Sequence, residues 1–371
     1  MAASWGRVLV GTAGATVGLG AGVAIGALAE ARAPIQRTVE VPAASDAGVR
    51  LRILHISDVH MWRHSRWEVA WLSSLARLQP DLVVLTGDNL CEAQGLAPLI
   101  EALTPLTGIP GAFVFGSNDY YSGVFSLPLR YAGPAARNVA RRLHNCRVSA
   151  RAHADAKPRT RSRHVPDLPH RELAAFLTDT LGWADLRNGG AVLDIAPRLP
   201  GQVDDVGAEP RLRLSLSGVD DPHINYDAVV RDGPDWTAAD LRIGITHAPY
   251  ARVVDEFTAH GADLVLAGHT HGGQVCLPVG RALVNNCDAP LEASGGLSRW
   301  HIGDVAAPKP HTDHGIVRPG RDLSDQVGRS TWLHVSRGLG TSKYAPFRLF
   351  CRPETTMLYV SVANATSPAR A

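Results

Sequence analysis

Two histidines separated by one residue follow a short apolar run in the second half of the chain. The run is Leu264 to Ala267, and His269 and His271 come after Gly268, with two more glycines behind them. Side chains at positions i and i+2 of an extended segment point to the same side, and glycines let backbone and ligand approach closely. A single histidine at a strand end usually makes an ordinary hydrogen bond. This pair, with no lysine or arginine in the same segment, indicates a metal or phosphate site.

Four more apolar runs end in side chains that can bind metal. These side chains are Asp58 and His60 after Leu51 to Ile56, Asp88 after Leu82 to Leu85, Ser117, Asn118 and Asp119 after Ala112 to Phe115, and His247 after Ile243 to Thr246. An Asp-x-His pair is typical of a divalent ion bound by both oxygen and nitrogen. Because ligands of open α/β sheets gather at the carboxyl ends of strands, we expect these strand ends to converge on one crevice.

Strands and helical segments alternate along the chain, which predicts βαβ units and an α/β fold with a buried sheet. Helices are predicted at Trp67 to Leu78, Leu96 to Leu106 and Arg171 to Leu181. Further strands are predicted at Gly190 to Ile195, Arg211 to Ser217, Leu241 to Thr246, Trp332 to Ser336 and Met357 to Ala363. Residues 49–364 are therefore expected to form one domain. Polar insertions interrupt it near residues 149–169 and 303–327, and residues 365–371 are expected to be a frayed tail.

Composition excludes several classes of protein. The 371 residues are 45% hydrophobic and 19% charged, as in a globular protein, and the net charge of +2 implies no field for binding polyanions. No aromatic stacking platform accompanies the basic residues, so nucleic acid is not expected as a partner. The five cysteines are scattered, which argues against a disulfide framework and against a thiolate zinc site. The scattered histidines of the C-terminal third are expected at the surface: His301, His311, His314 and His334.

The N-terminal residues 1–48 are expected to be a membrane segment and a linker. Val8 to Ala29 contains no charged residue over about 22 positions, enough to cross a hydrocarbon core of roughly 30 Å. We favour an uncleaved single anchor, which makes the protein membrane-associated. A signal peptide cleaved after the small residues Ala27 to Ala29, followed by export, is the alternative. The side of the membrane that the domain faces stays open.

The ordered set of strand-end residues resembles the calcineurin-like metallophosphoesterases. Within them, the chain is most similar to the membrane-associated bacterial branch, which carries segments like SDVH, GHTHGGQ and a C-terminal GLGTS followed by APFR. The resemblance covers roughly Leu51 to Val362 without the two insertions. It implies a four-layer α/β/β/α sandwich of two mixed sheets, with two divalent ions, Mn, Fe or Zn, at the strand ends.

The resemblance also implies the metal ligands. Asp58, His60 and His271 would hold the first ion, His247, His269 and an amide from the Gly116 turn the second, and Asp88 would bridge both. Family members usually have Gly-Asn-His-Asp or Gly-Asn-His-Glu at this turn, whereas this chain has Gly116-Ser117-Asn118-Asp119. Either Ser117 or Asn118 then fills the ligand position, and we favour Asn118 because an amide oxygen is the better donor. The helper imidazole is missing, and His64, His223 or a loop arginine could replace it.

Two divalent ions roughly 3.5–4 Å apart can share a hydroxide and clamp the oxygens of a phosphate ester. We therefore predict metal-dependent hydrolysis of a phosphate mono- or diester, with Asp88, Asn118 and Asp119 as catalytic residues and no protein nucleophile. The membrane segment favours a lipid-linked or phospholipid substrate, and Trp62 could line an apolar groove for it. The alternative is a membrane-anchored module that binds metal or phosphate and is catalytically weakened at Asn118. No obligate protein partner is indicated.

Overall fold

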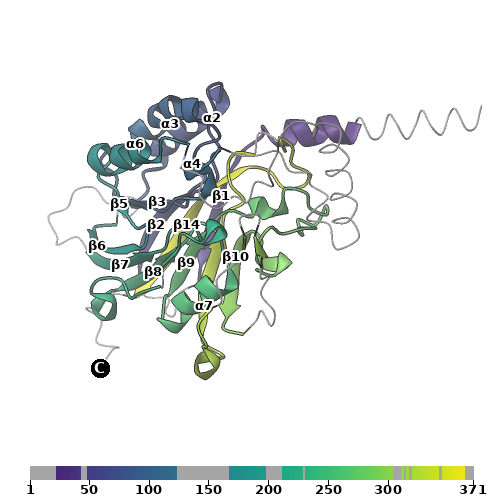
Figure 1. Cartoon of the computed structure of the whole chain (residues 1–371). Coiled ribbons are helices and arrows are strands. Elements are labelled where there is room, and N and C mark those ends of the chain that lie inside the picture. The colour runs from purple at the N-terminus through teal and green to yellow at the C-terminus, as the bar shows by residue number, and fades with distance from the viewer. Residues whose placement is uncertain are drawn as a thin grey trace, which may run out of the picture.

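The chain folds into two six-stranded sheets with helices on their outer faces (Figure 1). The computed structural model describes residues 22–42, 48–122, 167–197, 211–228, 230–303, 311–312, 315–316, 320–341 and 345–363. Both sheets mix parallel and antiparallel neighbours, and the predicted α/β sandwich of two mixed sheets is confirmed.

The first sheet has a parallel centre that carries three of the five predicted strand ends. Its strands, in spatial order, are β1 (Ile35–Val41), β14 (Glu354–Ala363), β2 (Gly48–Ile56), β3 (Leu82–Leu85), β4 (Gly111–Phe113) and β5 (Ala184–Asp185). Strands β2 to β5 run parallel to one another. The C-terminal strand β14 lies antiparallel to β2 and carries β1 on its other side.

The second sheet repeats this arrangement. In spatial order it contains β10 (Gly296–His301), β13 (Ser330–Val335), β9 (Leu264–Ala267), β8 (Leu241–Ile245), β7 (Leu212–Gly218) and β6 (Gly189–Ile195). Strands β13, β9, β8 and β7 are parallel, and β10 and β6 are antiparallel edge strands. Within the predicted second insertion, β11 (His311–Thr312) pairs with β12 (Gly315–Ile316).

The three predicted helices begin close to where the sequence pattern places them but are shorter: α2 (Arg66–Ser74), α3 (Leu96–Leu103) and α6 (His170–Ala175). The structure adds α4 (Ser117–Tyr120) and α7 (Ala251–Ala259). Three of them continue as a turn of another helical type: Leu75–Leu78 and Thr104–Leu106 are 3₁₀, and Phe176–Thr180 is a π-helix. Pro105, which has no backbone N–H to donate, explains the change at the end of α3.

Alternation along the strands separates the core into layers. On β2, Leu51 and Ile53 face the second sheet and pack in one cluster with Leu214 and Ile243. Their neighbours Leu54 and Ile56 belong to the outer cluster, which Leu72 of α2 and Leu99 of α3 complete. Side chains alternate between the faces of a strand, so both faces of the sheet are buried. Trp67 and Trp71 pack against this outer cluster.

Residues 22–30 form a short helix that precedes β1. The predicted anchor runs from Val8 to Ala29, and its residues 8–21 lie outside the described residues. No helix in the described part is long and apolar enough to cross a membrane. Most of the insertion near 149–169 and the tail at 365–371 also lie outside the described residues. Four cysteines in the described part are buried and form no disulfide with one another: Cys91, Cys276, Cys287 and Cys351.

A buried histidine pair joins the two sheets beneath the strand ends. His55 on β2 and His334 on β13 are both 0% exposed, and their Nδ1 atoms lie 2.9 Å apart. The other ring nitrogen of His55 lies 3.0 Å from the hydroxyl of Thr86. The prediction that His334 is a surface histidine is therefore wrong. A polar residue that alternates with apolar residues along a strand is expected to face solvent. Here His334 faces the other sheet, where His55 is its hydrogen-bond partner.

We expect this pair to make the fold acid-sensitive. Burial lowers the pKa of His334 to about 4, whereas the unfolded chain takes up the proton near pH 6.5. Between these values the unfolded state binds more protons, so stability is lost as the pH falls from 6.5 to 4, by about 3 kcal/mol for this group. Urea unfolding in EDTA from pH 7 to 4.5 measures the loss, which should be smaller in His334→Gln. Equal pH slopes in the two proteins would contradict this assignment.

Candidate metal centre

The predicted strand ends converge at one edge of the sandwich. Asp58 and His60 follow β2, Asp88 follows β3, and α4 with Asn118 follows β4 in the first sheet. From the second sheet, His247 follows β8, and His269 and His271 follow β9. These strands are parallel within each sheet, which brings their carboxyl ends to the same edge. All six carboxylate and imidazole side chains are buried.

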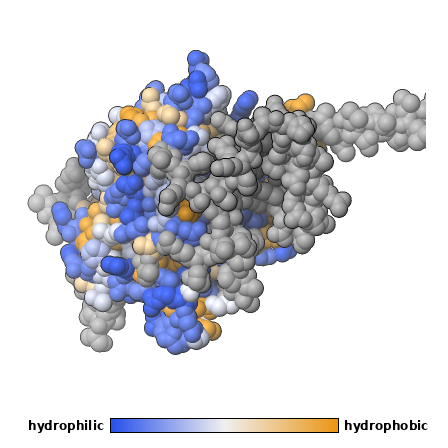
Figure 2. Space-filling model, in the orientation of Figure 1, coloured by the Kyte–Doolittle hydropathy of each residue, from blue (hydrophilic) through white to orange (hydrophobic). Residues whose placement is uncertain are grey.

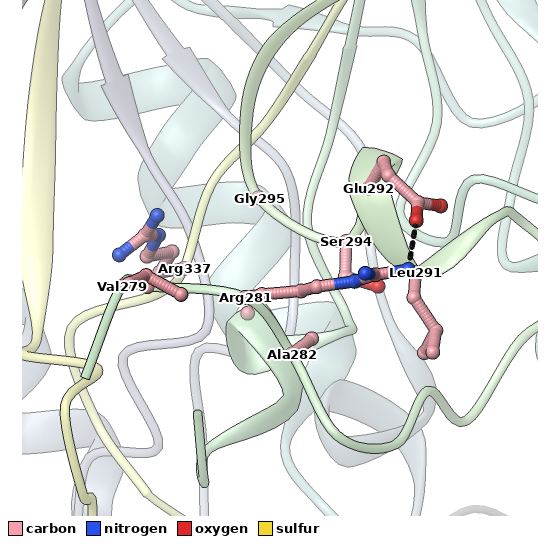
Figure 3. A pocket seen from close by; sticks show the side chains of 10 residues that line it. Val279, Arg281, Ala282, Leu291, Glu292, Ser294, Gly295 and Arg337 are labelled. Carbon is pink, nitrogen blue, oxygen red and sulfur yellow. Dashed lines mark hydrogen bonds and ion pairs between the residues drawn. The ribbon is translucent and has the colours of Figure 1, made fainter. Parts of the chain in front are cut away.

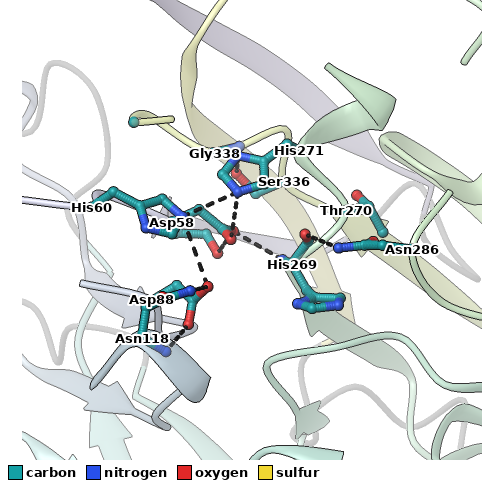
Figure 4. A network of polar contacts seen from close by, with 12 residues as sticks. Asp58, His60, Asp88, Asn118, His269, Thr270, His271, Asn286, Ser336 and Gly338 are labelled. Atoms are coloured by element: carbon teal, nitrogen blue, oxygen red, sulfur yellow. Dashed lines mark hydrogen bonds and ion pairs between the residues drawn. The ribbon is translucent and has the colours of Figure 1, made fainter. Parts of the chain in front are cut away.

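The first group consists of Asp58, His60 and His271, as the resemblance implied. The Nε2 atoms of the two histidines lie 3.1 Å apart, and Nε2 of His271 lies 3.5 Å from Oδ1 of Asp58. Figure 4 shows the rings of His60 and His271 directed towards the same point beside Asp58. The other oxygen of Asp58 accepts hydrogen bonds from the hydroxyl of Ser57 and the backbone N–H of His269.

The second group consists of Asp88, His247 and His269. Nδ1 of His269 lies 3.2 Å from Nε2 of His247, which in turn lies 3.5 Å from Oδ1 of Asp88. The other oxygen of Asp88, Oδ2, lies 3.7 Å from Nε2 of His60 in the first group. Asp88 therefore faces one group with each of its oxygens. This is the position required of a carboxylate that bridges two ions.

Five of the six residues in these groups have a left-handed backbone. Their φ angles are 50° at Asp58, 48° at His60, 55° at Asp88, 69° at His269 and 51° at His271. Residues other than glycine seldom adopt this region, although Asp and His tolerate it better than most. Each such residue costs of order 1–3 kcal/mol and persists where its surroundings impose it, as at functional sites.

Asp119 imposes the conformation at Asp88. Its carboxylate is 0% exposed and accepts hydrogen bonds from the backbone N–H groups of Asp88, Asn89 and Gly116 at 2.8–2.9 Å. The turns after β3 and β4 are thereby tied together. A Cβ atom at Gly116 would collide with the carboxylate of Asp88 and the ring of His247, so this position requires glycine. Asp119 thus positions Asp88 through the backbone N–H groups of the two turns. The predicted catalytic role of Asp119 stays a prediction.

The residues present fit a pair of divalent ions. Ligand nitrogens about 2.1 Å from one ion lie about 3.0–3.4 Å from each other, and the two histidine pairs are separated by 3.1 and 3.2 Å. Oδ1 of Asp58, the oxygen that faces His271, is buried without a hydrogen-bond partner among the described residues. Buried polar atoms are almost always satisfied, so an orphaned carboxylate oxygen at this site indicates a cation.

The pKa shifts of the two carboxylates and of His247 also indicate a site that attracts positive charge. Burial raises the pKa of Asp58. Burial would also raise the pKa of Asp88, but His247, His60 and His269 outweigh it and hold that pKa well below its usual value. Burial would lower the pKa of His247, yet Asp88 and Asp221 raise it well above normal. Burial lowers the pKa of the other three histidines, His60, His269 and His271, so these rings favour the neutral form that binds metal.

Asn118 lies beside Asp88, the residue shared by the two groups. Its amide nitrogen donates to Oδ2 of Asp88 at 2.7 Å, and its backbone N–H donates to Oδ1 at 2.8 Å (Figure 4). Ser117 is also buried, as the first residue of α4. Which of the two binds an ion stays a prediction. No imidazole comes from this turn.

Arg348 is a residue that spacing alone did not reveal. Its guanidinium is 0% exposed, and Nη2 lies 3.2 Å from Nδ1 of His271 and donates to the backbone oxygens of Gly338 and Gly340. Arg348 thereby holds the ring of His271 at Nδ1, while Nε2 of the same ring faces His60. The only signal in the sequence was its place in the APFR segment of the resemblance.

A pocket of about 250 Å³ adjoins the loop that carries His271 (Figure 3). Gly272 and the side chain of Arg337 form one part of its wall, and Arg281, paired with Glu292, crosses it. None of the six residues of the two groups lines this pocket. The candidate metal centre is therefore separate from it.

A model of the calcineurin-like phosphoesterase family matches residues 51–273, more than half of the chain. This range contains every residue of the two groups, from Asp58 to His271. A search of the curated proteins finds no match.

Solved structures match at low similarity. GAP50 of Plasmodium, the anchor in the inner membrane complex, is 11% identical with a TM-score of 0.29, over 59% of this chain and 66% of that one, just under two thirds. A dimetal phosphatase from Danio rerio is 12% identical (TM-score 0.28; 60% and 82% covered). The purple acid phosphatase PPD1 from yellow lupin seeds is 9% identical (TM-score 0.28; 78% and 54% covered). These values are too low to indicate a shared activity.

We expect the two groups to bind one ion each. Glycine accepts the left-handed φ of His60 and His269 but supplies no ligand, so His60→Gly and His269→Gly should each retain one ion where the wild type retains two. Asp88→Asn should weaken the binding of both. Plasma mass spectrometry after dialysis against Mn²⁺ gives the ions per chain, and His64→Ala is the control. Two ions retained in both glycine variants would refute this division of the ligands.

Proposed function

The chain belongs to the calcineurin-like phosphoesterase family, and from this premise we propose that it hydrolyses phosphate mono- or diesters in a metal-dependent reaction. One observation carries the proposal: the buried carboxylate of Asp88 faces both groups of ligands, with Oδ2 near His60 and Oδ1 near His247. Two divalent ions, when bound at such a site, polarise a phosphate ester and make water a better nucleophile.

Several residues of the chain hold the metal-binding side chains in position for this reaction. Asp119 and Gly116 fix Asp88 between the two groups, and Arg348 fixes the ring of His271. Asn118 presents a polar amide beside Asp88, and its oxygen is the proposed ligand of the second ion. The sandwich keeps these side chains buried, so their charges act on a bound phosphate with little screening by water.

Turnover of simple esters tests the proposal. Purified protein with Mn²⁺, Fe²⁺ or Zn²⁺ should hydrolyse p-nitrophenyl phosphate or bis(p-nitrophenyl) phosphate. Asp88→Asn should lower kcat/KM at least about 100-fold, or about 2.7 kcal/mol in transition-state stabilisation. His64→Ala, which alters an exposed histidine, is the matched control. Esters left intact with all three metals, and an Asp88→Asn variant that behaves identically, would sink the proposal.

The turn at Asn118 favours one other function. Because this turn carries an amide in place of an imidazole, a module that binds metal or phosphate without turnover is the second candidate. Two bound ions without turnover would point to it, and Asn118→His would then be expected to introduce hydrolysis. The ion count alone does not separate the two candidates, since both require metal.

We further propose that the substrate is a phospholipid or lipid-linked phosphate, as in the membrane-associated bacterial branch that the chain resembles. The end of the uncharged stretch Val8 to Ala29 forms most of the helix of residues 22–30. Glu30 at the end of this helix accepts hydrogen bonds from the backbone N–H groups of Phe350 and Cys351, close to Arg348 and the metal centre. A helix held at a bilayer would therefore bring the centre to the lipid.

Exposed apolar side chains support this placement. On the helix, Val23 is 48% exposed and Ile25 67%, and Phe350 beside it is 47% exposed. The turn that follows Cys276 adds Val279, which is 85% exposed. The face of the molecule seen in Figure 2 is mostly hydrophilic, with only small hydrophobic areas between polar residues. Apolar side chains next to an uncharged segment are suited to contact with lipid.

Vesicle flotation tests the role of the N-terminal segment. The full chain should float with phospholipid vesicles, whereas a chain that starts at residue 22 should not, because it lacks most of the uncharged stretch. The shorter chain keeps Glu30 and its contacts and should hydrolyse a soluble aryl ester at the wild-type rate. Equal flotation of the two proteins would show that the segment is not the membrane anchor.

A further inference from the structure

The centre has no imidazole from the turn after β4, but another histidine outside the two groups lies beside the second group. Of the replacements suggested by the sequence, His64 is exposed and packs edge-to-face against Trp62 at the surface. His223 is 6% exposed, and its ring centroid lies 4.3 Å from that of His269 in the second group. His223 is therefore the candidate that reaches the metal centre.

The fold brings His223 to this position through β7. Strand β7 runs parallel to β8, and the 3₁₀ turn Pro222–Ile224 follows its carboxyl end. His247 and His269 follow the neighbouring strands β8 and β9 at the same edge. His223 thus belongs to the same row of strand ends as two residues of the second group, one strand further along the sheet.

Two contacts hold His223, one at its backbone and one at its ring. The carboxylate of Asp221 accepts a hydrogen bond from the backbone N–H of His223 at 2.8 Å and caps the 3₁₀ turn. The hydroxyl of Tyr250, which is 1% exposed, lies 3.0 Å from Nδ1 of His223. When the phenol donates its hydrogen to Nδ1, the neutral imidazole carries its own hydrogen on Nε2. The ring is then a hydrogen-bond donor beside the second group.

We propose that His223 is a substrate-binding residue that donates a hydrogen bond to an oxygen of the phosphoryl group held at the second group. The contact supplies from β7 what the turn at Asn118 does not. A hydrogen bond to an anionic oxygen is about twice as strong as one between neutral groups, and it is most effective in a buried site. Tyr250 and Asp221 act on the substrate only through His223 and are positioning residues. The inference rests on the proposed function, because it assumes a phosphate ester as substrate.

Binding of inorganic phosphate to the Mn²⁺-loaded protein, measured by calorimetry, tests the contact without relying on turnover. His223→Leu should weaken phosphate binding about 10-fold while the protein retains two ions. His223→Gln keeps an N–H donor at the end of its side chain and should retain most of the affinity. Tyr250→Phe, which only loosens the ring, should give a smaller loss. His64→Leu should bind as the wild type does.

The outcomes separate this inference from the proposed function. Phosphate binding by His223→Leu at the wild-type affinity, with both ions present, would overturn the role of His223 and leave the proposed function standing. Loss of an ion from His223→Leu and from His223→Gln alike would also overturn it, since His223 would then only support His269. If the wild type with two ions does not bind phosphate at all, this inference fails, and the turnover assay alone decides the proposed function. Should His223→Leu not fold, Tyr250→Phe and His223→Gln still decide the question.

Discussion

Asp58 and Asp88 are buried carboxylates, and the other groups of the centre have to balance their negative charge. An ionised carboxylate removed from water costs several kcal/mol unless other groups meet its charge. The structure meets it with backbone N–H groups, with hydroxyl and amide donors, and with four imidazoles drawn from both sheets. One oxygen of Asp58 still has no hydrogen-bond partner in the described part of the chain. The charge balance of the interior therefore depends on cations, and metal binding is part of the architecture.

Much of this architecture could be predicted from the sequence. The bounds of β3 and β9 agree with the predicted runs at both ends, because strands buried on both faces are continuous apolar runs. The strand ends then give the ligands, since parallel strands present their carboxyl ends at one edge. Helix ends were predicted less well: the periodicity of α3 continues to Leu106, but Pro105 changes the hydrogen bonding before that point.

What the sequence could not give are contacts between distant segments. His334 reads as a surface residue of a strand until its partner, His55, is seen 2.9 Å away on the other sheet. Asn118 could be weighed against Ser117 only by the chemistry of their side chains, whereas the structure shows its amide in contact with Asp88. His223 was one of several candidates until the packing of β7 beside β8 placed its ring on His269. The left-handed φ angles were also hidden, because no glycine marks those positions.

The left-handed backbone at five of the six metal-group residues has a consequence for the life of the protein in a cell. At 1–3 kcal/mol each, these five conformations store an amount of energy comparable to the whole stability of a typical domain, about 5–15 kcal/mol. Bound ions repay that energy, since any ligand that binds the folded state alone stabilises it by mass action. Metal would then serve as a folding cofactor, and chains made during metal starvation would be exposed to proteases. The abundance of the protein would thus follow the supply of its ion.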